Sequence, residues 1–519
     1  MYNNLIEICE ENNYEKTNDI DIKKIYIKLN FNKGVLLSKS NKIEAMNIFD
    51  KIYCKYNNED DKEIKKIVLY SYMNKGICMS KLEELEKAIE IYDKVVEKYG
   101  NEDDREIKRI VVDAYAKKGV CMSKLEKTEE AIEIYDEVVE KYSNEDDKEI
   151  KRLIAMTYMN KSICIRKMEK IEEAIEIYDK VVEKYGNEDD KEIKRIVIDA
   201  YVGKGVCMSK LEKTEEAIEI YDEVVEKYSN EDDKEIKRLI AMTYMNKSIC
   251  IRKMKKLEEV IEIYDKVVEK YGEEDDKEIK KIVIDAYIGK SVCMSKLEKT
   301  EEAIEIYDKV VEKYSNEDDE EILEKIFLVY DYKAMYLAEE GDELGALEVY
   351  KKIIKSNWIN KNYLSDKFNR TKINIAYLLR RTGANEYNID IKQLLKYGVE
   401  DGDGVALINS ALISINEKKY EDALNNFFSI KDNSCLEWWT KSLNDDDKEK
   451  YIVIYLGILS GKYHTKISCI EEIEKKLLSF DLQYIVNGFR KIVKKDEYYK
   501  EAVFELEDKE CSTEVMVSK

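Results

Sequence analysis

Apolar side chains recur at helical spacing along most of this chain, in two stretches that return every 43 residues. Within one block, both stretches place their apolar residues three or four positions apart, on one face of a helix. The first stretch has Ile107, Ile110, Val111, Ala114, Tyr115, Met122 and Leu125, and the second has Ala131, Ile134, Tyr135, Val138 and Tyr142. Each block therefore predicts two amphipathic helices, which we name helix A and helix B.

Polar residues at the block edges predict where these helices begin and end. The acidic triplet Glu102-Asp103-Asp104 precedes helix A, where carboxylates cap free N–H groups and meet the positive end of the helix dipole. Thr128 is a suitable N-cap for helix B. Three blocks have glycine where helix B ends, and there we expect left-handed C-terminal caps. These glycines are Gly100, Gly186 and Gly272.

The acidic triplet marks a regular array. It begins at Glu59, Glu102, Glu145, Glu188, Glu231, Glu274 and Glu317, in steps of 43 residues. A second period is superimposed, because Lys151–Met168 returns letter for letter at Lys237–Met254, 86 residues later. One helix pair cannot bury both of its apolar stripes, whereas stacked neighbours can, so the period predicts a linear stack of helix pairs.

The blocks resemble the tetratricopeptide repeat family, whose pattern includes an aromatic residue, a small glycine and a later Ala-x3-Phe. The second block reads Tyr72-x2-Lys75-Gly76-x2-Met79, followed by Ala88-x3-Tyr92. The alanine–aromatic pair recurs at Ala45/Phe49, Ala131/Tyr135, Ala174/Tyr178, Ala217/Tyr221, Ala303/Tyr307 and Ala346/Tyr350, with Val260/Tyr264 as the enlarged copy. The resemblance covers eight units over residues 20–358.

Two departures from the family pattern carry structural expectations. Family repeats have 34 residues, and the extra residues here, such as Asn187 to Arg195, read as helical, which predicts a first helix about two turns longer. Lysine replaces the family leucine, and its stem is expected to lie on apolar surface while its charge reaches water. These lysines are Lys75, Lys118, Lys161, Lys204, Lys247 and Lys290.

The pattern as a whole predicts an all-α protein of stacked antiparallel helix hairpins, and the resemblance implies that they form a right-handed α-solenoid. We expect an N-terminal helical cap over residues 1–19, eight repeats over 20–358, a diverged helical region over 359–506 and a loose tail over 507–519. One more hairpin is expected from Ala406 to Phe427, where Ala423-x3-Phe427 keeps the family phase. Asp401-Gly402-Asp403-Gly404 is expected to be a turn with an N-cap rather than a calcium loop.

The resemblance implies a superhelix whose concave face is lined by A helices and binds peptides. It assigns to this face Met73, Asn74, Ile77, Lys81, Lys117, Lys124, Met159, Asn160, Ile163, Arg166, Lys167, Lys210, Met245, Asn246, Arg252, Lys253 and Lys296, together with Asp113 and Met156. Six of these lysines form a ladder one repeat apart, so an acidic peptide with hydrophobic anchors would suit the face. The alternative is that these lysines are solvated helix ends, and that the acidic triplets, which could attract a basic partner, serve capping and solubility.

Composition narrows the classes of function. The net charge of −23 disfavours nucleic-acid binding. Cysteines on one helix position every 43 residues indicate buried thiols in a reducing compartment, and no secretory or membrane-spanning run is visible, so the cytoplasm is expected. No cofactor or metal motif is present, and the single histidine, His464, is expected at the surface.

These features predict a protein-interaction scaffold that is not an enzyme. The alternative is a regulatory receptor that changes superhelical pitch when it binds a signalling peptide. An enzyme with its site in residues 361–506 is the third hypothesis, which predicts a deep pocket with converging acids. The sequence leaves the oligomeric state open.

Overall fold

The structure is a computed structural model, and it describes Ile6 and residues 19–355, 369–383, 391–432, 434–436, 439, 443, 447–460 and 470–493. All regular elements in these ranges are helices. The chain divides into two compact units, residues 1–297 and 298–519. The expectations for residues 1–5, 7–18 and 507–519 and for His464 lie outside the described residues.

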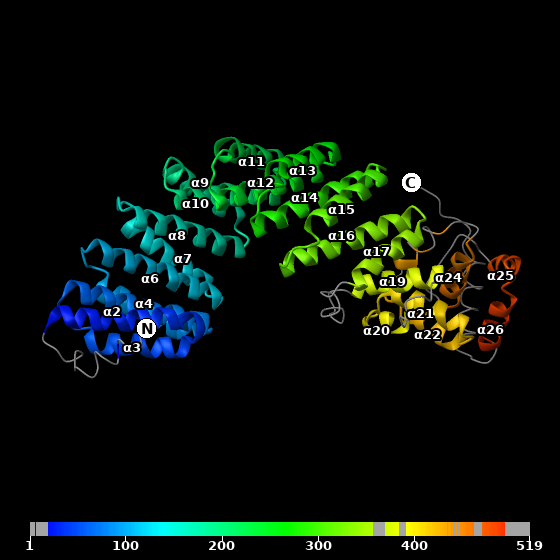
Figure 1. The fold of residues 1–519 in the computed structure, drawn as a ribbon, viewed down its shortest axis with the longest axis horizontal. Coiled ribbons are helices and arrows are strands. Elements are labelled where there is room, and N and C mark those ends of the chain that lie inside the picture. Colours follow the sequence, from blue (N-terminus) through cyan, green and yellow to red (C-terminus); the bar gives the residue numbers. More distant parts are fainter. Residues whose placement is uncertain are drawn as a thin grey trace, which may run out of the picture. The chain divides into compact units, whose positions relative to one another are not determined.

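Unit 1 alternates long and short helices in the predicted order (Figure 1). Its A helices are α2 (Ile20–Ser40), α4 (Lys62–Lys81), α6 (Arg105–Lys124), α8 (Lys148–Lys167), α10 (Lys191–Lys210), α12 (Lys234–Lys253) and α14 (Lys277–Lys296). Its B helices are α3 (Lys42–Tyr56), α5 (Leu85–Tyr99), α7 (Thr128–Tyr142), α9 (Ile171–Tyr185), α11 (Thr214–Tyr228) and α13 (Leu257–Tyr271). From α4 onward the A helices have 20 residues and the B helices 15.

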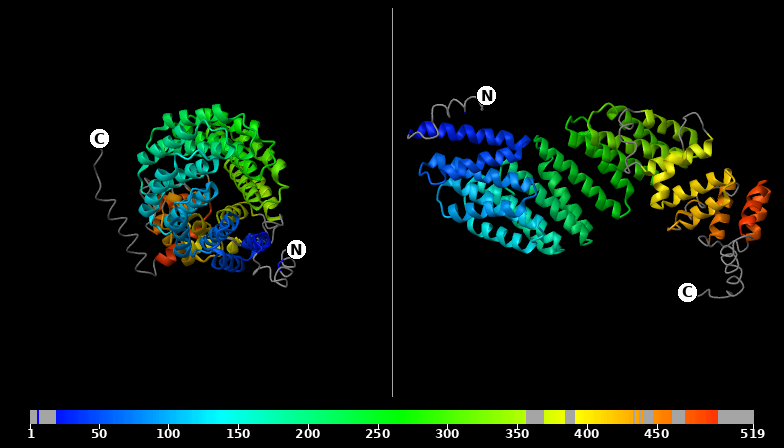
Figure 2. Two further views of the ribbon diagram at one scale, coloured as in Figure 1. Left: turned by 90° about the vertical axis from the view of Figure 1, so that its left-hand side faces the viewer. Right: turned by 90° about the horizontal axis from the view of Figure 1, so that it is seen from below.

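Neighbouring helices in unit 1 pack in chain order, as a linear stack requires. Each A helix also contacts the A helix of the next repeat, whereas contacts between consecutive B helices are few or absent among the described residues. The A helices therefore approach one another more closely and lie on the inner side of the curved stack. Figure 1 shows B helices such as α11 and α13 on the outer side of this unit, and Figure 2 shows the same helices from two further directions.

The core of each repeat is built from the alanine and the aromatic residue that the sequence pattern singled out. Ala131 and Tyr135 of α7 are buried and form a cluster with Cys164 of the following A helix. Ala217, Tyr221 and Cys250 repeat this arrangement. The expected buried thiols are thus confirmed, and a small side chain at the cysteine position leaves room for the tyrosine ring of the preceding repeat.

The third residue of each acidic triplet caps helix A, as predicted. Asp104 accepts hydrogen bonds from the backbone N–H groups of Glu106 and Ile107, at 3.0 and 3.1 Å. The expectation that the extra residues from Asn187 are helical holds only from Lys191, because Asp190 is the N-cap of α10. Thr128 does not cap α7. Lys127 occupies the N-cap position and its side chain makes no capping hydrogen bond.

The turn between helix A and helix B uses a left-handed residue that is not glycine. In the third repeat this residue is Glu126, with φ of 62°, and Lys127 N–H donates to the carbonyl of Met122 at 3.0 Å. The expectation of left-handed caps at Gly100, Gly186 and Gly272 is wrong. These glycines have φ between −61° and −63°, because helix B ends in right-handed geometry.

Unit 2 is also helical, with a less regular succession. Its helices are α15 (Thr300–Tyr314), α16 (Glu320–Glu339), α17 (Glu343–Lys355), α19 (Asn369–Thr382), α20 (Ile391–Asp401), α21 (Gly404–Asn416), α22 (Tyr420–Phe428), α24 (Lys448–Leu459), α25 (Ile470–Ser479) and α26 (Gln483–Val493). The chain passes from unit 1 to unit 2 after Leu297, within the seventh repeat of the sequence pattern.

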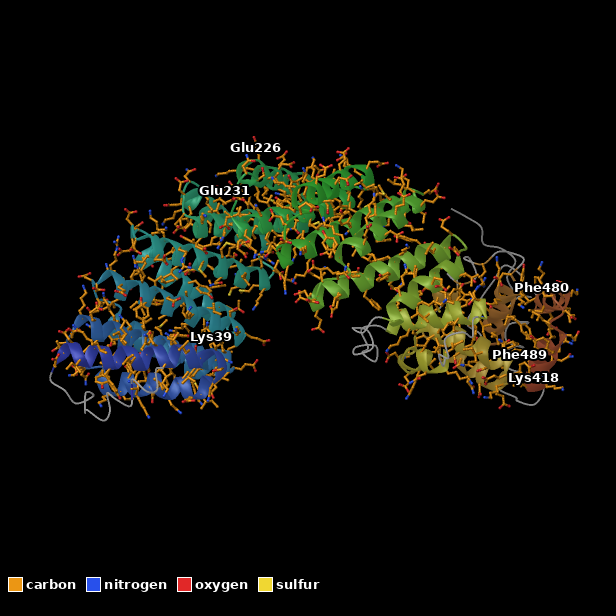
Figure 3. All side chains as sticks on the ribbon, viewed as in Figure 1. Lys39, Glu226, Glu231, Lys418, Phe480 and Phe489 are labelled. Carbon is orange, nitrogen blue, oxygen red and sulfur yellow. The ribbon has the colours of Figure 1, made fainter. Side chains whose placement is uncertain are left out.

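The hairpin expected from Ala406 to Phe427 is confirmed by α21 and α22, which pack together. Ala423 and Phe427 are fully buried, and Asp403 caps α21 by accepting from Ala406 N–H at 2.9 Å. The turn after α21 has Lys418 with φ of 61°, and Figure 3 marks this residue. It repeats the geometry of Glu126, so the repeat-type turn persists in the diverged region.

Candidate functional site

The A helices of unit 1 carry large apolar side chains that the core does not cover. Met156 and Ile163 of α8 are 41% and 47% exposed, and their copies in α12, Met242 and Ile249, are 37% and 44% exposed. A separation of seven residues is about two helical turns, so each pair lies on one face of its helix. Tyr70 of α4 occupies the position of Met156 and is 36% exposed. We call this surface the A-helix face.

The A-helix face alternates from one repeat to the next. At the position of Met156, the A helices α6, α10 and α14 carry aspartates, Asp113, Asp199 and Asp285. The 86-residue period of the sequence thus places exposed apolar residues of α8 and α12 on either side of α10, which has Asp199 at the position of Met156 and Met242.

The buried tyrosine of helix B also takes two different positions from one repeat to the next. In the third repeat, Tyr135 packs on Gly119 of its own A helix, where an added Cβ would lie 2.6 Å from the ring Cζ. The fourth repeat has Ser162 at the position of Gly119, and its tyrosine, Tyr178, packs on Gly203 of the next A helix instead. An added Cβ at Gly203 would lie 2.6 Å from Cζ of Tyr178. Ser162 is thus accompanied by Gly203 on the next A helix, and Ser248 with Gly289, which packs on Tyr264, repeats this arrangement.

Arg166 takes part in this packing. It was expected on the concave face, but its side chain reaches toward Tyr178. Its Nη1 donates to the hydroxyl of Tyr178 at 3.2 Å, and the side chain is half-buried. Its copy Arg252 is exposed, as expected for a residue on the face.

The remaining expected face residues fall into two groups. Met73 is 3% exposed and belongs to the core. A buried side chain cannot contact a ligand, so Met73 is not part of the face. Half-buried residues that border the exposed apolar row are Asn74, Ile77, Lys117, Met159, Asn160, Met245 and Asn246. Asn74 Nδ2 donates to the carbonyl of Tyr70 at 2.8 Å, which fixes its amide on the helix surface. Tyr70 and Met242 were not expected, although Met242 could have been found as the 86-residue copy of Met156.

A row of six exposed lysines ends the A helices α4 to α14, one per repeat. The members of this lysine row are Lys81, Lys124, Lys167, Lys210, Lys253 and Lys296. Within the described part of the chain, none of the six makes an ion pair with a carboxylate. Lys253 Nζ donates instead to the hydroxyl of Ser209 at 2.9 Å, and Lys167 to that of Ser123 at 3.3 Å. A lysine at a helix C-terminus is favoured by the helix dipole, which accounts for the position but leaves the charge available.

A second set of lysines, in the middle of the A helices, has acidic partners. Lys118 pairs with Asp93 at 2.5 Å and Lys204 with Asp179 at 2.6 Å, each on the preceding B helix. Lys75, Lys161, Lys247 and Lys290 repeat this pairing with Asp50, Asp136, Asp222 and Asp265. The expectation that these charges reach water is wrong, because each reaches a carboxylate of the preceding repeat.

The acidic triplets are also neutralised within the stack. Lys108 pairs with Glu145 at 3.0 Å, and Lys194 pairs with Glu231 at 2.9 Å. Arg109 binds both carboxylate oxygens of Asp147 at 2.8 and 2.6 Å, and this pairing lowers the pKa of Asp147 to about 2. These contacts join consecutive repeats, so capping and repeat stacking account for most of the acidic edge.

Unit 2 contains converging charges, but they form a closed network. Arg380 donates to Glu449 at 2.6 Å and to Asn409 at 2.9 Å, and Arg381 donates to Glu343 at 2.7 Å and to Asp447 at 2.9 Å. Phe427 and Phe489 belong to the filled apolar core of this unit. Among the described residues no group of acidic, histidine or cysteine side chains is arranged to hold a metal ion. No described helix is long and apolar enough to cross a membrane.

The sequence profile of the tetratricopeptide repeat matches four segments of the chain, residues 70–101, 113–145, 199–231 and 285–317. The second segment begins eight residues after the start of α6 at Arg105. Each segment thus covers the end of an A helix and the following B helix, and the family pattern leaves out the first two turns of the A helix.

Several solved structures match this chain with low sequence identity. The apo form of RapI is 15% identical over 73% of this chain and 99% of its own, with a TM-score of 0.43. The apo quorum sensor NprR from B. thuringiensis is 14% identical over 72% of this chain and 98% of its own, with a TM-score of 0.38. A tetratricopeptide repeat protein from Parabacteroides merdae is 13% identical over 58% and 98%, with a TM-score of 0.34. No sequence match was found among curated proteins.

Proposed function

Because this chain carries tetratricopeptide repeats, we propose that it is an interaction scaffold whose A-helix face binds an extended segment of another protein. The proposal gives the chain a binding role rather than a catalytic one. The buried free thiols of the repeats suit a reducing compartment, and we place the protein in the cytoplasm on that ground.

The observation that carries the proposal is the exposure of Met156, Ile163, Met242 and Ile249 on one face of two identical helix segments. Other apolar residues of the same helix, such as Leu153 and Ile154, are buried, so the exposure is confined to one face of the helix. Apolar side chains that recur on one surface are typical of interaction sites, and methionine adapts its shape to varied partners.

The lysine row adds a charge preference along one border of this face. Six exposed lysines without carboxylate partners lie at the C-terminal ends of consecutive A helices. Acidic residues of a bound segment would supply the missing partners, while its apolar residues contact the methionines and isoleucines. We therefore propose a partner with hydrophobic anchors and acidic groups toward this border.

Replacement of the exposed methionines tests the proposal. The double variant Met156→Glu plus Met242→Glu is expected to weaken binding of a partner, captured from the native host and then purified, by at least about tenfold, since two carboxylates would meet apolar anchors. Ile43→Glu is the control, because Ile43 is exposed on the B helix α3. Equal affinity of the wild-type chain and the double variant for the purified partner would refute the proposed face.

A receptor that changes superhelical pitch is the second candidate. The observation that favours it is that the tyrosine of helix B can pack in two ways. Tyr135 packs on the A helix of its own repeat, whereas Tyr178 packs on the A helix of the next repeat. A shift of such a side chain would alter the contact between consecutive repeats, and small changes per repeat add along a stack. Small-angle scattering with and without the bound partner tests this candidate, and an unchanged profile at saturation would count against it.

A further inference from the structure

Asp199 is an exposed carboxylate in the middle of the A-helix face. It lies on α10, which contacts α8 on one side and α12 on the other. Those two helices carry the identical apolar residues Met156 and Ile163, and Met242 and Ile249. The acid is therefore flanked by two matching apolar rows.

The equivalent acid of the third repeat is neutralised, whereas Asp199 is not. Asp113 pairs with Lys117 one turn later, at 2.9 Å. The residue one turn after Asp199 is Gly203, and no described residue forms an ion pair or hydrogen bond with the Asp199 carboxylate. Gly203 cannot be replaced by a lysine without moving Tyr178, whose ring fills the adjacent space. The packing of Tyr178 thus leaves Asp199 without a lysine partner.

The arginines nearest to Asp199 have other acidic partners. Arg195 on the same helix binds Asp233 at 2.8 Å and Glu192 at 2.5 Å. Arg238 on α12 binds Glu235 at 3.0 Å. The protein around Asp199 raises its pKa through desolvation, and the charge of Arg238 opposes this effect. A cation brought by a ligand would relieve the cost of this partly desolvated charge.

We infer that Asp199 selects a positively charged residue in the bound segment, placed midway between two apolar anchors. The inference rests on the proposed function and specifies its ligand. Because α10 separates α8 from α12, the two apolar rows are roughly 20 Å apart at the usual spacing of packed helices. An extended chain spans this distance in about six residues at about 3.3 Å per residue. The ligand is a seven-residue stretch with apolar first and last residues and a lysine or arginine in the centre.

Three synthetic peptides test this inference on the full chain. They share leucine at both ends and serine at the other positions, and they carry lysine, norleucine or glutamate in the centre. We expect the lysine peptide to bind about tenfold more tightly than the norleucine peptide by fluorescence anisotropy, and the glutamate peptide to bind more weakly than both. Asp199→Asn should remove the preference for lysine and leave the affinity for the norleucine peptide unchanged. Asp113→Asn is the matched control and should keep the preference, because Lys117 already pairs with Asp113.

The outcomes separate the inference from the proposed function. Suppose that the peptides bind equally well whatever their central residue, and that Met156→Glu plus Met242→Glu abolishes this binding. This result would overturn the inference and leave the proposed face intact. A preference for lysine that persists in Asp199→Asn would also overturn it. Peptide binding that the methionine changes do not affect would contradict the face itself. Absence of binding by all three peptides would overturn the stated ligand, while the test with the native partner would still decide the proposed function.

Discussion

The ring of Tyr178 lies against Gly203 of the following A helix, where an added Cβ would be 2.6 Å from the ring Cζ. The corresponding ring of Tyr135 lies against Gly119 of its own A helix, which is Ser162 in the repeat of Tyr178. This relationship explains why the chain repeats over two helix pairs as well as over one. It also leaves Asp199 without the lysine that Asp113 has one turn later, because Gly203 stands at that position.

The first prediction concerns the coupling between Ser162 and Gly203. Gly203→Asn should lower the free energy of unfolding by about 2 kcal/mol, because the new side chain meets the Tyr178 ring. Addition of Ser162→Gly should recover about 1 kcal/mol or more, since Tyr178 can then take the position that Tyr135 has on Gly119. Urea denaturation of the wild-type chain, both single variants and the double variant measures the coupling. If the changes in unfolding free energy of the two single variants simply add up in the double variant, Ser162 and Gly203 are not coupled.

The second prediction concerns the length of a tolerated deletion. Removal of residues 151–236 joins two identical segments and preserves the alternation, so the shorter chain should remain folded and helical. Removal of residues 191–233 puts Asn246 at the position of Gly203, against which the Tyr178 ring packs. This shorter chain should be markedly less stable. Circular dichroism during thermal unfolding compares the two. Equal stability of both deletion variants would show that the alternation has no structural role.

The third prediction concerns acid. Asp147 is 2% exposed and paired with Arg109, and its pKa is lowered to about 2 from 3.8. A lowered folded-state pKa stabilises the fold above the unfolded-state value, and this contribution is lost as the pH falls from about 4 to about 2. Asp147→Asn should therefore cost about 2 kcal/mol at pH 7 and progressively less in that pH range. Asp146→Asn is the control, because the side chain of Asp146 is 94% exposed. A cost of Asp147→Asn that stays constant down to pH 2 would argue against the ion pair.

The fourth prediction concerns the lysine row. Lys167→Glu plus Lys253→Glu should weaken binding of an identified partner by about tenfold, and the loss should diminish at high salt. Lys213→Glu plus Lys256→Glu makes the same change in net charge at exposed lysines that precede the B helices. This control pair should leave the affinity nearly unchanged. Similar losses in both pairs would mean that net charge, rather than the lysine row, governs association.

Much of the fold follows from the sequence because repeat architecture is written in local spacing. The period of the acidic triplets gives the starts of the A helices, and Asp104 caps α6 as the residue type predicts. The Ala131–Tyr135 pair marks the core for the same reason, since four residues along a helix return to one face. The hairpin of Ala423 and Phe427 could be found in the diverged region by this spacing alone.

Features that depend on a partner in another repeat could not be predicted from spacing. Lys161 has the same sequence neighbours whether its charge meets water or Asp136, and the choice depends on how two repeats stack. The left-handed turn at Glu126 lacks the glycine that usually signals this conformation. Met73 and Met156 both read as apolar residues facing inward, but Met73 is buried and Met156 is exposed, and they lie at repeat positions only three residues apart, since Met73 matches Met159 and Met156 matches Tyr70.

Site-specific photocrosslinking tests the central claim most directly. A photoreactive amino acid at Ile163 lies on the A-helix face, whereas one at Glu226 lies on the outer side of α11, where Figure 3 marks the residue. With a purified partner, the account predicts a covalent adduct from position 163 and none from position 226. An adduct from position 226 without one from position 163 would show that the partner binds the outer side of the stack.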